Sequence, residues 1–154
     1  METSLPTRAA RSGFTLIELL LVIGIIAILA SIVIVAINPT KQMGDARNAQ
    51  RRSDVNTILN AVYQYAIDNS GAMPGCLGED PPTGGSICVK GSTCTGVAGG
   101  CNLDALTTSY IVDLPRDPSG ATGNDTNYDV AITSGRVTVS APQAEQDQTI
   151  SVTR

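Results

Sequence analysis

A single apolar stretch near the N-terminus limits what this chain can fold into more than any other feature. Residues 14–37 read FTLIELLLVIGIIAILASIVIVAI and contain one charged residue, Glu18, and no proline. A helix of this length would be roughly 36 Å long at about 1.5 Å per residue, which is enough to cross a hydrocarbon core of about 30 Å. The basic residues Arg8 and Arg11 precede the stretch, which places the N-terminus in the cytoplasm by the positive-inside rule. We therefore expect a single-pass precursor in the cytoplasmic membrane.

Two features distinguish this stretch from an ordinary cleaved signal peptide. The apolar core of a signal peptide is about 7–15 residues long and is followed by a small-x-small cleavage site, whereas the residues after this longer run, 38–42 (NPTKQ), offer no such site. Glu18 is the second feature, because a carboxylate in a membrane costs at least about 2.5–3.5 kcal/mol on insertion scales. A carboxylate at that cost indicates a function and a partner.

The residues Gly13-Phe14-Thr15-Leu16-Ile17-Glu18 resemble the processing site of type IV pilins, behind a short basic leader. The resemblance implies that residues 1–13 are a leader peptide, that a prepilin peptidase cleaves after Gly13, and that Phe14 is then N-methylated. It also implies that Glu18 pairs with the α-amino group of Phe14 on a neighbouring subunit during filament assembly. The helix of residues 14–37 would then lie in the membrane before assembly and in the filament core afterwards.

Residues 38–70 predict an amphipathic second half of this helix. Pro39 removes one helical hydrogen bond, so we expect a kink there, with a full stop and a loop as the alternative. Apolar residues then recur with helical spacing at Val55, Ile58, Leu59, Val62, Tyr65 and Ala66. The earlier arginines, Arg47, Arg51 and Arg52, lie away from that stripe, and we interpret them as a solvated or subunit-contacting face rather than a nucleic-acid site.

Residues 71–154 predict an extracellular head that holds all four cysteines, Cys76, Cys88, Cys94 and Cys101. Their spacings contain no C-x-x-C pair, so zinc-ribbon and thioredoxin-type sites do not fit. A segment that follows a membrane helix lies outside the cytoplasm, where disulfides persist, and we expect two of them. The resemblance to small pilins implies the pairs Cys88–Cys94 and Cys76–Cys101, and local pairing of Cys76–Cys88 with Cys94–Cys101 is the alternative.

The rest of the head predicts one short helix and an antiparallel sheet. Asn102 is a good N-cap for a helix within residues 102–115, which Pro115 ends. Apolar residues alternate within residues 128–132 and 137–139 around a Ser134-Gly135 turn, and a third short strand follows at residues 150–152. The predicted fold is α+β, with a long N-terminal helix packed on a small C-terminal sheet that covers the apolar stripe.

Composition excludes several classes of function. The chain has no histidine, which removes Ser-His and Cys-His catalysis, and residues 71–154 are acidic rather than basic, unlike a nucleic-acid-binding domain. The stretch Asp125–Asp129 begins like an EF-hand loop, but Val130 and Arg136 replace the glycine and glutamate that such a loop needs. We therefore expect no enzyme activity, no cofactor and no metal.

Our preferred hypothesis from the sequence is a structural subunit of a type IV pilus, which the family uses for adhesion, twitching motility or DNA uptake. Its expected partners are copies of itself, the prepilin peptidase, the assembly platform with its ATPase, and the membrane before assembly. The alternative is a pseudopilin of a type II secretion system, which shares the same N-terminus. We favour the pilus because the main pseudopilin head is expected to contain a tryptophan-containing loop and a calcium site, and this chain has no tryptophan. A membrane-tethered enzyme is the third hypothesis, and no nucleophile–base pair supports it.

Overall fold

The computed structural model describes residues 13–79, 84–97 and 99–154. The predicted leader therefore lies outside the described residues, apart from Gly13. The chain divides into two compact units, Met1–Pro39 and Thr40–Arg154, which are described separately below. The first contains α1 (Leu16–Ile37), and the second contains nearly all of α2 (Pro39–Asp68) together with the sheet.

The helix is interrupted where Asn38 and Pro39 predicted an interruption. It takes the form of two helices separated by Asn38, rather than one bent helix, because Asn38 adopts a left-handed conformation with φ 48° and ψ 75°. Asparagine tolerates this region better than most residues. Pro39 then opens α2, a position where its missing N–H is not needed and its fixed φ suits a helix.

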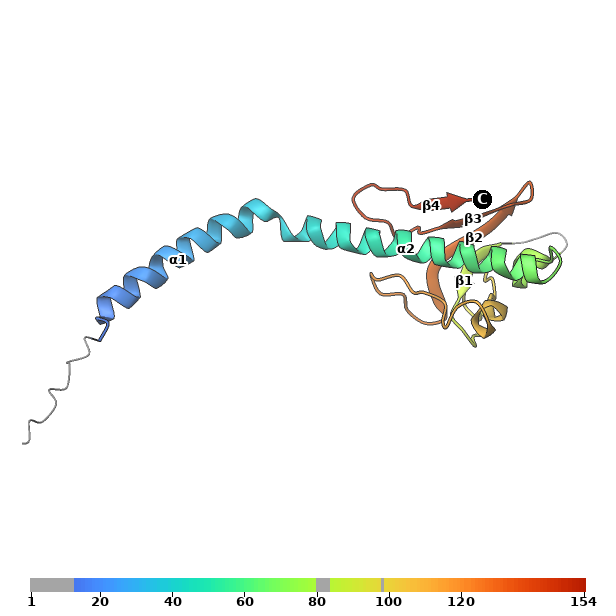
Figure 1. The fold of residues 1–154 in the computed structure, drawn as a ribbon, viewed down its shortest axis with the longest axis horizontal. Coiled ribbons are helices and arrows are strands. Elements are labelled where there is room, and N and C mark those ends of the chain that lie inside the picture. The colour runs from blue at the N-terminus through green and yellow to red at the C-terminus, as the bar shows by residue number, and fades with distance from the viewer. Residues whose placement is uncertain (1–12, 80–83, 98) are drawn as a thin grey trace, which may run out of the picture. The chain divides into compact units, whose positions relative to one another are not determined.

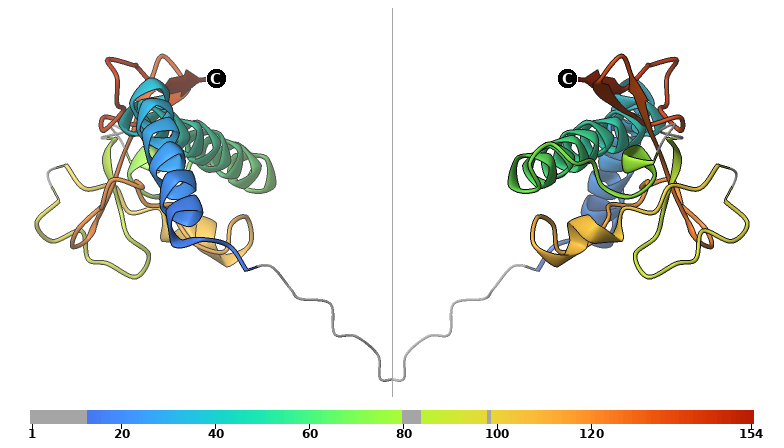
Figure 2. Two further views of the ribbon diagram at one scale, coloured as in Figure 1. Left: turned by 90° about the vertical axis from the view of Figure 1, so that its left-hand side faces the viewer. Right: turned by 90° about the vertical axis from the view of Figure 1, so that its right-hand side faces the viewer.

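The sheet of the second unit has four antiparallel strands in the order β1-β2-β3-β4. They are β1 (Gly85–Cys88), β2 (Asp125–Thr133), β3 (Arg136–Ser140) and β4 (Ser151–Thr153). The predicted hairpin at Ser134-Gly135 joins β2 to β3, with Thr133 opposite Arg136. The prediction missed β1, which lies within a segment rich in glycine, proline, serine and threonine. The sheet lies against one side of α2 (Figure 1 and Figure 2).

The core of the second unit lies between α2 and the sheet. It contains the predicted helical stripe from Val55 to Val62 and the inward-facing residues of β2 and β3, among them Tyr128, Val130, Val137 and Val139. These residues are completely or almost completely buried. The predicted packing of the sheet on the stripe is therefore confirmed.

Two disulfides and two short 3₁₀ helices organise the segment between α2 and β2. The disulfides are Cys76–Cys101 and Cys88–Cys94, the same pairs that the resemblance to small pilins implied. The 3₁₀ helices are Gly75–Gly78 and Asp104–Thr108. The second lies where a short helix was predicted within residues 102–115, and the Asn102 side chain accepts a hydrogen bond from the amide of Asp104 at 2.7 Å.

Candidate functional site

The segment around Gly13 presents the predicted cleavage bond outside any helix. Residues 13–15 precede α1, and the side chain of Phe14 is 78% exposed. Among the described residues, and apart from its neighbour in the chain, none lies within 4 Å of the position that a side chain at Gly13 would occupy. The Gly13–Phe14 bond is thus sterically open to an approaching peptidase. Cleavage after Gly13 and methylation of Phe14 remain predictions.

Glu18 takes part in a capping box at the start of α1, which the sequence analysis missed. The amide of Glu18 donates to the Thr15 hydroxyl at 3.3 Å, and the amide of Thr15 donates to the Glu18 carboxylate at 3.5 Å. Both bonds satisfy backbone N–H groups that the first turn of a helix leaves without partners. The pattern T-x-x-E ahead of an apolar run was the sequence signal for it. Glu18 therefore has a partner within its own helix before any processing, and its pairing with Phe14 of another subunit remains a prediction.

Helix α1 is long and apolar enough to cross a membrane. It has 22 residues, and none of them is buried by the described part of the chain. Length and composition alone do not distinguish a membrane anchor from a signal sequence at this position.

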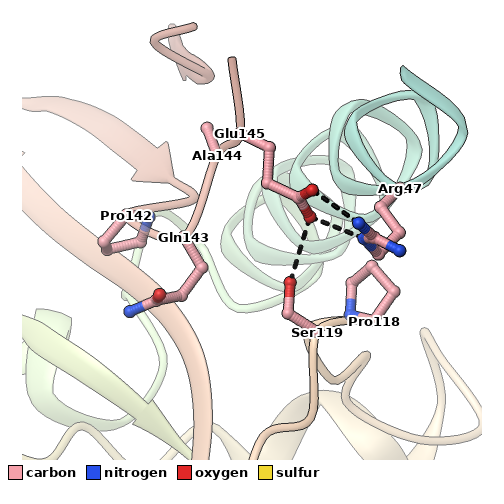
Figure 3. Close-up of a pocket in the computed structure, with 7 residues that line it drawn as sticks. All are labelled: Arg47, Pro118, Ser119, Pro142, Gln143, Ala144 and Glu145. Carbon is pink, nitrogen blue, oxygen red and sulfur yellow. Dashed lines mark hydrogen bonds and ion pairs between the residues drawn. The ribbon is translucent and has the colours of Figure 1, made fainter. Parts of the chain in front are cut away.

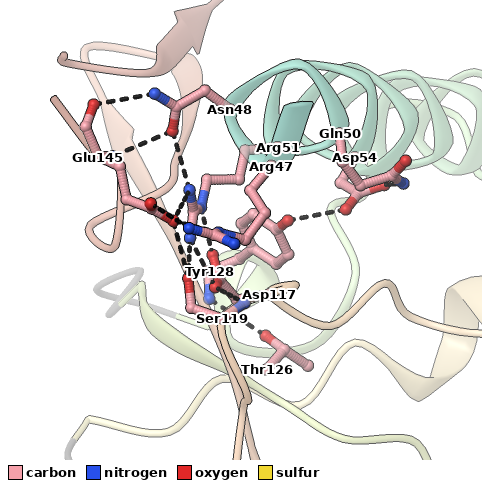
Figure 4. A network of polar contacts seen from close by, with 10 residues as sticks. All are labelled: Arg47, Asn48, Gln50, Arg51, Asp54, Asp117, Ser119, Thr126, Tyr128 and Glu145. Atoms are coloured by element: carbon pink, nitrogen blue, oxygen red, sulfur yellow. Dashed lines mark hydrogen bonds and ion pairs between the residues drawn. The ribbon is translucent and has the colours of Figure 1, made fainter. Parts of the chain in front are cut away.

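The second candidate site is a buried ion pair in the second unit. Arg51 donates from Nε and Nη2 to the two carboxylate oxygens of Asp117 at 2.7 and 3.0 Å, and both side chains are 0% exposed (Figure 4). Burial alone would raise the pKa of Asp117, but hydrogen bonds from Arg51 and Ser119 outweigh it and lower the pKa. The interpretation of Arg51 as part of an outward-facing group is wrong, because its partner lies 66 positions away and helical spacing cannot reveal it.

A second carboxylate, Glu145, connects this pair to the surface. Its oxygens accept hydrogen bonds from Nε and Nη2 of Arg47 at 2.6 Å each, and one also accepts from Arg51 at 3.2 Å. The bonds from Arg47, helped by those from Arg51, lower the pKa of Glu145 to about 2. Arg47 is therefore half-buried and paired, contrary to our interpretation, while Arg52 is exposed as predicted.

Next to the ion pair, a polar contact is buried against the core. The Tyr128 hydroxyl donates to Asp54 at 2.7 Å, and the Gln50 amide donates to the other oxygen of the same carboxylate at 2.7 Å. Burial, together with the hydrogen bond to Asp54, raises the pKa of Tyr128. Across the described residues, every buried side-chain nitrogen and oxygen has a hydrogen-bond partner. This network is thus a satisfied structural feature, and no buried group in it awaits a ligand.

An open depression lies beside Glu145. Figure 3 shows Arg47, Ser119 and Glu145 pointing toward one another in it, between the loop at Pro118 and the segment from Pro142 to Glu145. The positive and negative groups of the depression neutralise each other. Its charge therefore favours neither an anionic nor a cationic ligand.

The acidic stretch at Asp125–Asp129 forms part of β2. Asp125 accepts hydrogen bonds from the Ser86 hydroxyl at 2.6 Å and from the amide of Asn127 at 2.8 Å. Within the described residues, no group of three or more metal-binding side chains comes together here or elsewhere. We derive no metal site from this stretch.

Comparison with known protein families and curated proteins matches the N-terminal segment and much of the chain. The prokaryotic N-terminal methylation motif matches residues 8–34. The chain is 33% identical over 110 residues to type II secretion system core protein G of Escherichia coli (strain K12), which covers 70% of this chain and 66% of that protein. It is 40% identical over 60 residues to type II secretion system core protein G of Aeromonas hydrophila, covering 39% and 41% of the two chains. No solved structure matches the chain.

The matched segments thus span just under two thirds of the length of the first relative and less than half of the second. The motif match includes Gly13, Phe14 and Glu18, the residues on which the resemblance to pilins depended. The second unit supplies the small antiparallel sheet packed on a helix that the apolar patterns of the sequence predicted. With this motif, this α+β architecture and these relatives, the chain belongs to the type IV pilin-like family.

Proposed function

We propose that the chain is a structural subunit of a pilin-like filament that assembles from the cytoplasmic membrane, and specifically a pseudopilin of a type II secretion system. The observation that supports this proposal most is the extent of the similarity to core protein G. That match covers 110 residues, whereas the methylation motif covers only residues 8–34. Pilins and pseudopilins share the N-terminal motif, so similarity outside it is what favours the secretion system. This reverses the preference that the sequence analysis gave to a surface pilus.

The proposed mechanism assigns separate roles to the two units. A prepilin peptidase removes the leader after Gly13, Phe14 is methylated, and α1 anchors the mature subunit in the membrane. The head, held by two disulfides, folds outside the cytoplasm. An assembly platform and its ATPase then add subunits to a homopolymer in which copies of α1 leave the lipid and pack on one another.

Deletion of the gene, followed by complementation, tests this proposal. We expect deletion to abolish release of secreted enzymes into the medium while surface filaments stay normal under electron microscopy. Complementation with the intact chain should restore secretion, and a chain with the substitution Gly13→Asp, which alters only the predicted cleavage site, should not. Loss of surface filaments with normal secretion would instead identify a pilus subunit.

The pilus subunit remains the second candidate because of the head. The head lacks the tryptophan expected of the main pseudopilin and carries two disulfides instead. Disulfides persist wherever a head lies outside the cytoplasm, so they suit both candidates, and the missing tryptophan is the observation that favours the pilus. The deletion experiment separates the two candidates directly.

Glu18 provides a test of assembly itself. Removal of one partner from a buried ion pair costs about 3–5 kcal/mol, so Glu18→Val should abolish assembly while leader cleavage, membrane insertion and the folded head persist. Thr15→Ala is the matched control, because it removes the hydroxyl of the capping box but leaves the carboxylate in place. The readouts are the recovery of enzyme secretion in the deletion strain and the amount of membrane-bound mature subunit. Normal secretion with Glu18→Val would show that Glu18 is not an assembly contact.

A further inference from the structure

The connection between β3 and β4 lies across the first turns of α2 and is held there by polar contacts. We call residues 142–149 the strap and residues 41–52 of α2 the junction segment. The residues on either side of the strap, Ala141 and Ile150, are both buried. They are bonded to each other, because the amide of Ala141 donates to the carbonyl of Ile150 at 2.9 Å. The strap can therefore leave the helix without opening the sheet.

The hydrophobic core does not reach the junction segment. Along α2 the apolar core begins at Val55, and the buried residues before Asp54 are Gly44, Asn48 and Arg51. The apolar side chain of Met43 is exposed. Since a protein helix gains most of its stability from burying an apolar face, the junction segment has to be held in helical form by other contacts.

The strap supplies most of those contacts, mainly through Glu145, and Arg51 at the end of the segment is held in addition by Asp117 and Ser119. The Asn48 side chain both donates to the carbonyl of Glu145 at 2.9 Å and accepts from its amide at 3.0 Å. The Glu145 carboxylate binds Arg47 and Arg51, as described above (Figure 4). Gln146 donates to the carbonyl of Lys41 at 2.6 Å, and Arg52 bonds to Gln148. The strap thus contacts the junction segment along nearly its whole length.

The backbone of the strap is in an unfavourable conformation where it meets the helix. Gln146 and Asp147 both lie in the left-handed region, with φ of 60° and 55°. Two successive residues other than glycine rarely adopt it and keep it only where surrounding contacts impose it. Loss of the contacts to Glu145 would let both residues relax, which favours the released state once release begins.

We propose that the strap and the junction segment form a latch, a unit that opens and closes on its own while the core from Val55 onward stays folded. Closed, the latch makes α2 a rigid rod as far as Lys41. Open, it converts residues 41–50 into a flexible tether that leads to the head, because Arg51 stays bound to Asp117 and Ser119. Local opening of this kind is expected where few buried apolar contacts hold a helix. The latch is defined by the fold of the second unit and does not depend on the proposed function.

Hydrogen exchange measured by mass spectrometry on the full chain in detergent micelles tests the latch. In the unmodified chain, amides of residues 45–52 should exchange faster than those of residues 55–66. Glu145→Gln weakens the charge-assisted bonds to both arginines, and we expect it to accelerate exchange of residues 45–52 by about tenfold to a hundredfold. Exchange of residues 55–66 should not change.

The matched control is Asp147→Asn, which makes the same chemical change two positions along the strap. Asp147 is exposed, and within the described residues its side chain makes no hydrogen bond or ion pair with the junction segment. Asparagine also suits its left-handed backbone. This variant should exchange like the unmodified chain. Asn48→Ala, which removes the two bonds to the backbone of Glu145, should reproduce the effect of Glu145→Gln from the helix side. Equal acceleration through residues 55–66 in these variants, or unchanged exchange at residues 45–52, would overturn the latch.

Discussion

The buried pair of Arg51 and Asp117 makes a sharp prediction about the stability of the head. Replacement of Asp117 by asparagine removes the negative charge but leaves the Arg51 guanidinium in a place with no access to water. Replacement of Arg51 by methionine leaves the carboxylate buried with the amide of Ser119 as its remaining backbone donor. Arg51→Met thus leaves an uncompensated carboxylate in the interior, and Asp117→Asn leaves the Arg51 guanidinium with only the partly exposed Glu145 as a charge partner. Arg51→Met combined with Asp117→Leu leaves neither buried charge.

The expected magnitude follows from this burial. Breaking a fully buried ion pair by removing one partner costs about 3–5 kcal/mol, whereas replacing both partners by apolar groups is often neutral. At roughly 4 °C per kcal/mol for a unit of this size, each single variant should lower the melting temperature by about 12–20 °C. The double variant should lose much less than the sum of the two single losses.

Tyrosine fluorescence makes this measurement specific to the head. The chain has no tryptophan, and its four tyrosines, Tyr63, Tyr65, Tyr110 and Tyr128, all lie in the second unit. A thermal or urea transition followed at this signal therefore reports head unfolding even when α1 stays helical in detergent. Losses below about 1 kcal/mol in both single variants, or a double variant whose loss equals their sum, would refute our reading of the pair as a desolvated one.

Two further predictions concern acid and the disulfides. The pKa of Glu145 is lowered to about 2 in the folded chain from its ordinary value near 4.5. Its ionised carboxylate therefore stabilises the fold above pH 4.5, and this stabilisation is lost as the pH falls toward 2. Acid unfolding followed by tyrosine fluorescence should show a smaller loss of stability in Glu145→Gln than in the unmodified chain. Replacement of Cys76 and Cys101 by serine removes a disulfide with a sequence separation of 25 and should lower the free energy of unfolding, measured in urea, by about 3.5 kcal/mol. Replacement of Cys88 and Cys94, whose separation is 6, should lower it by about 2 kcal/mol. Equal costs for the two pairs would show that loop length does not govern these disulfides.

Local patterns predicted much of the fold. The apolar stretch, the stripe from Val55 to Val62 and the alternation around the Ser134-Gly135 turn each depend on neighbouring residues, and each element formed as predicted. Strand β1 was missed because its glycine and serine residues favour loops. It forms through pairing with β2 across more than 35 positions and through a bridge between Ile87 and Cys101.

The polar part of the molecule was harder to predict for two different reasons. The burial of Arg51 depends on Asp117, and the helical pattern around Arg51 indicates only that it lies off the apolar stripe. The capping box of Thr15 and Glu18 follows from the local pattern T-x-x-E. We predicted a partner for the Glu18 carboxylate on another subunit, because a carboxylate in a membrane is costly, and did not consider a partner in its own helix. A long-range pair needs the fold, whereas the local cap needed only the sequence.

The measurement that tests the central claim most directly is the intact mass of the protein isolated from membranes of the organism that encodes it. We predict the mass of residues 14–154 plus one methyl group and minus four hydrogens for the two disulfides, with the methyl group on the α-amino group of Phe14. A mature protein that retains residues 1–13, or that begins at a residue other than Phe14, would contradict the claim that this chain is processed as a pilin-like subunit.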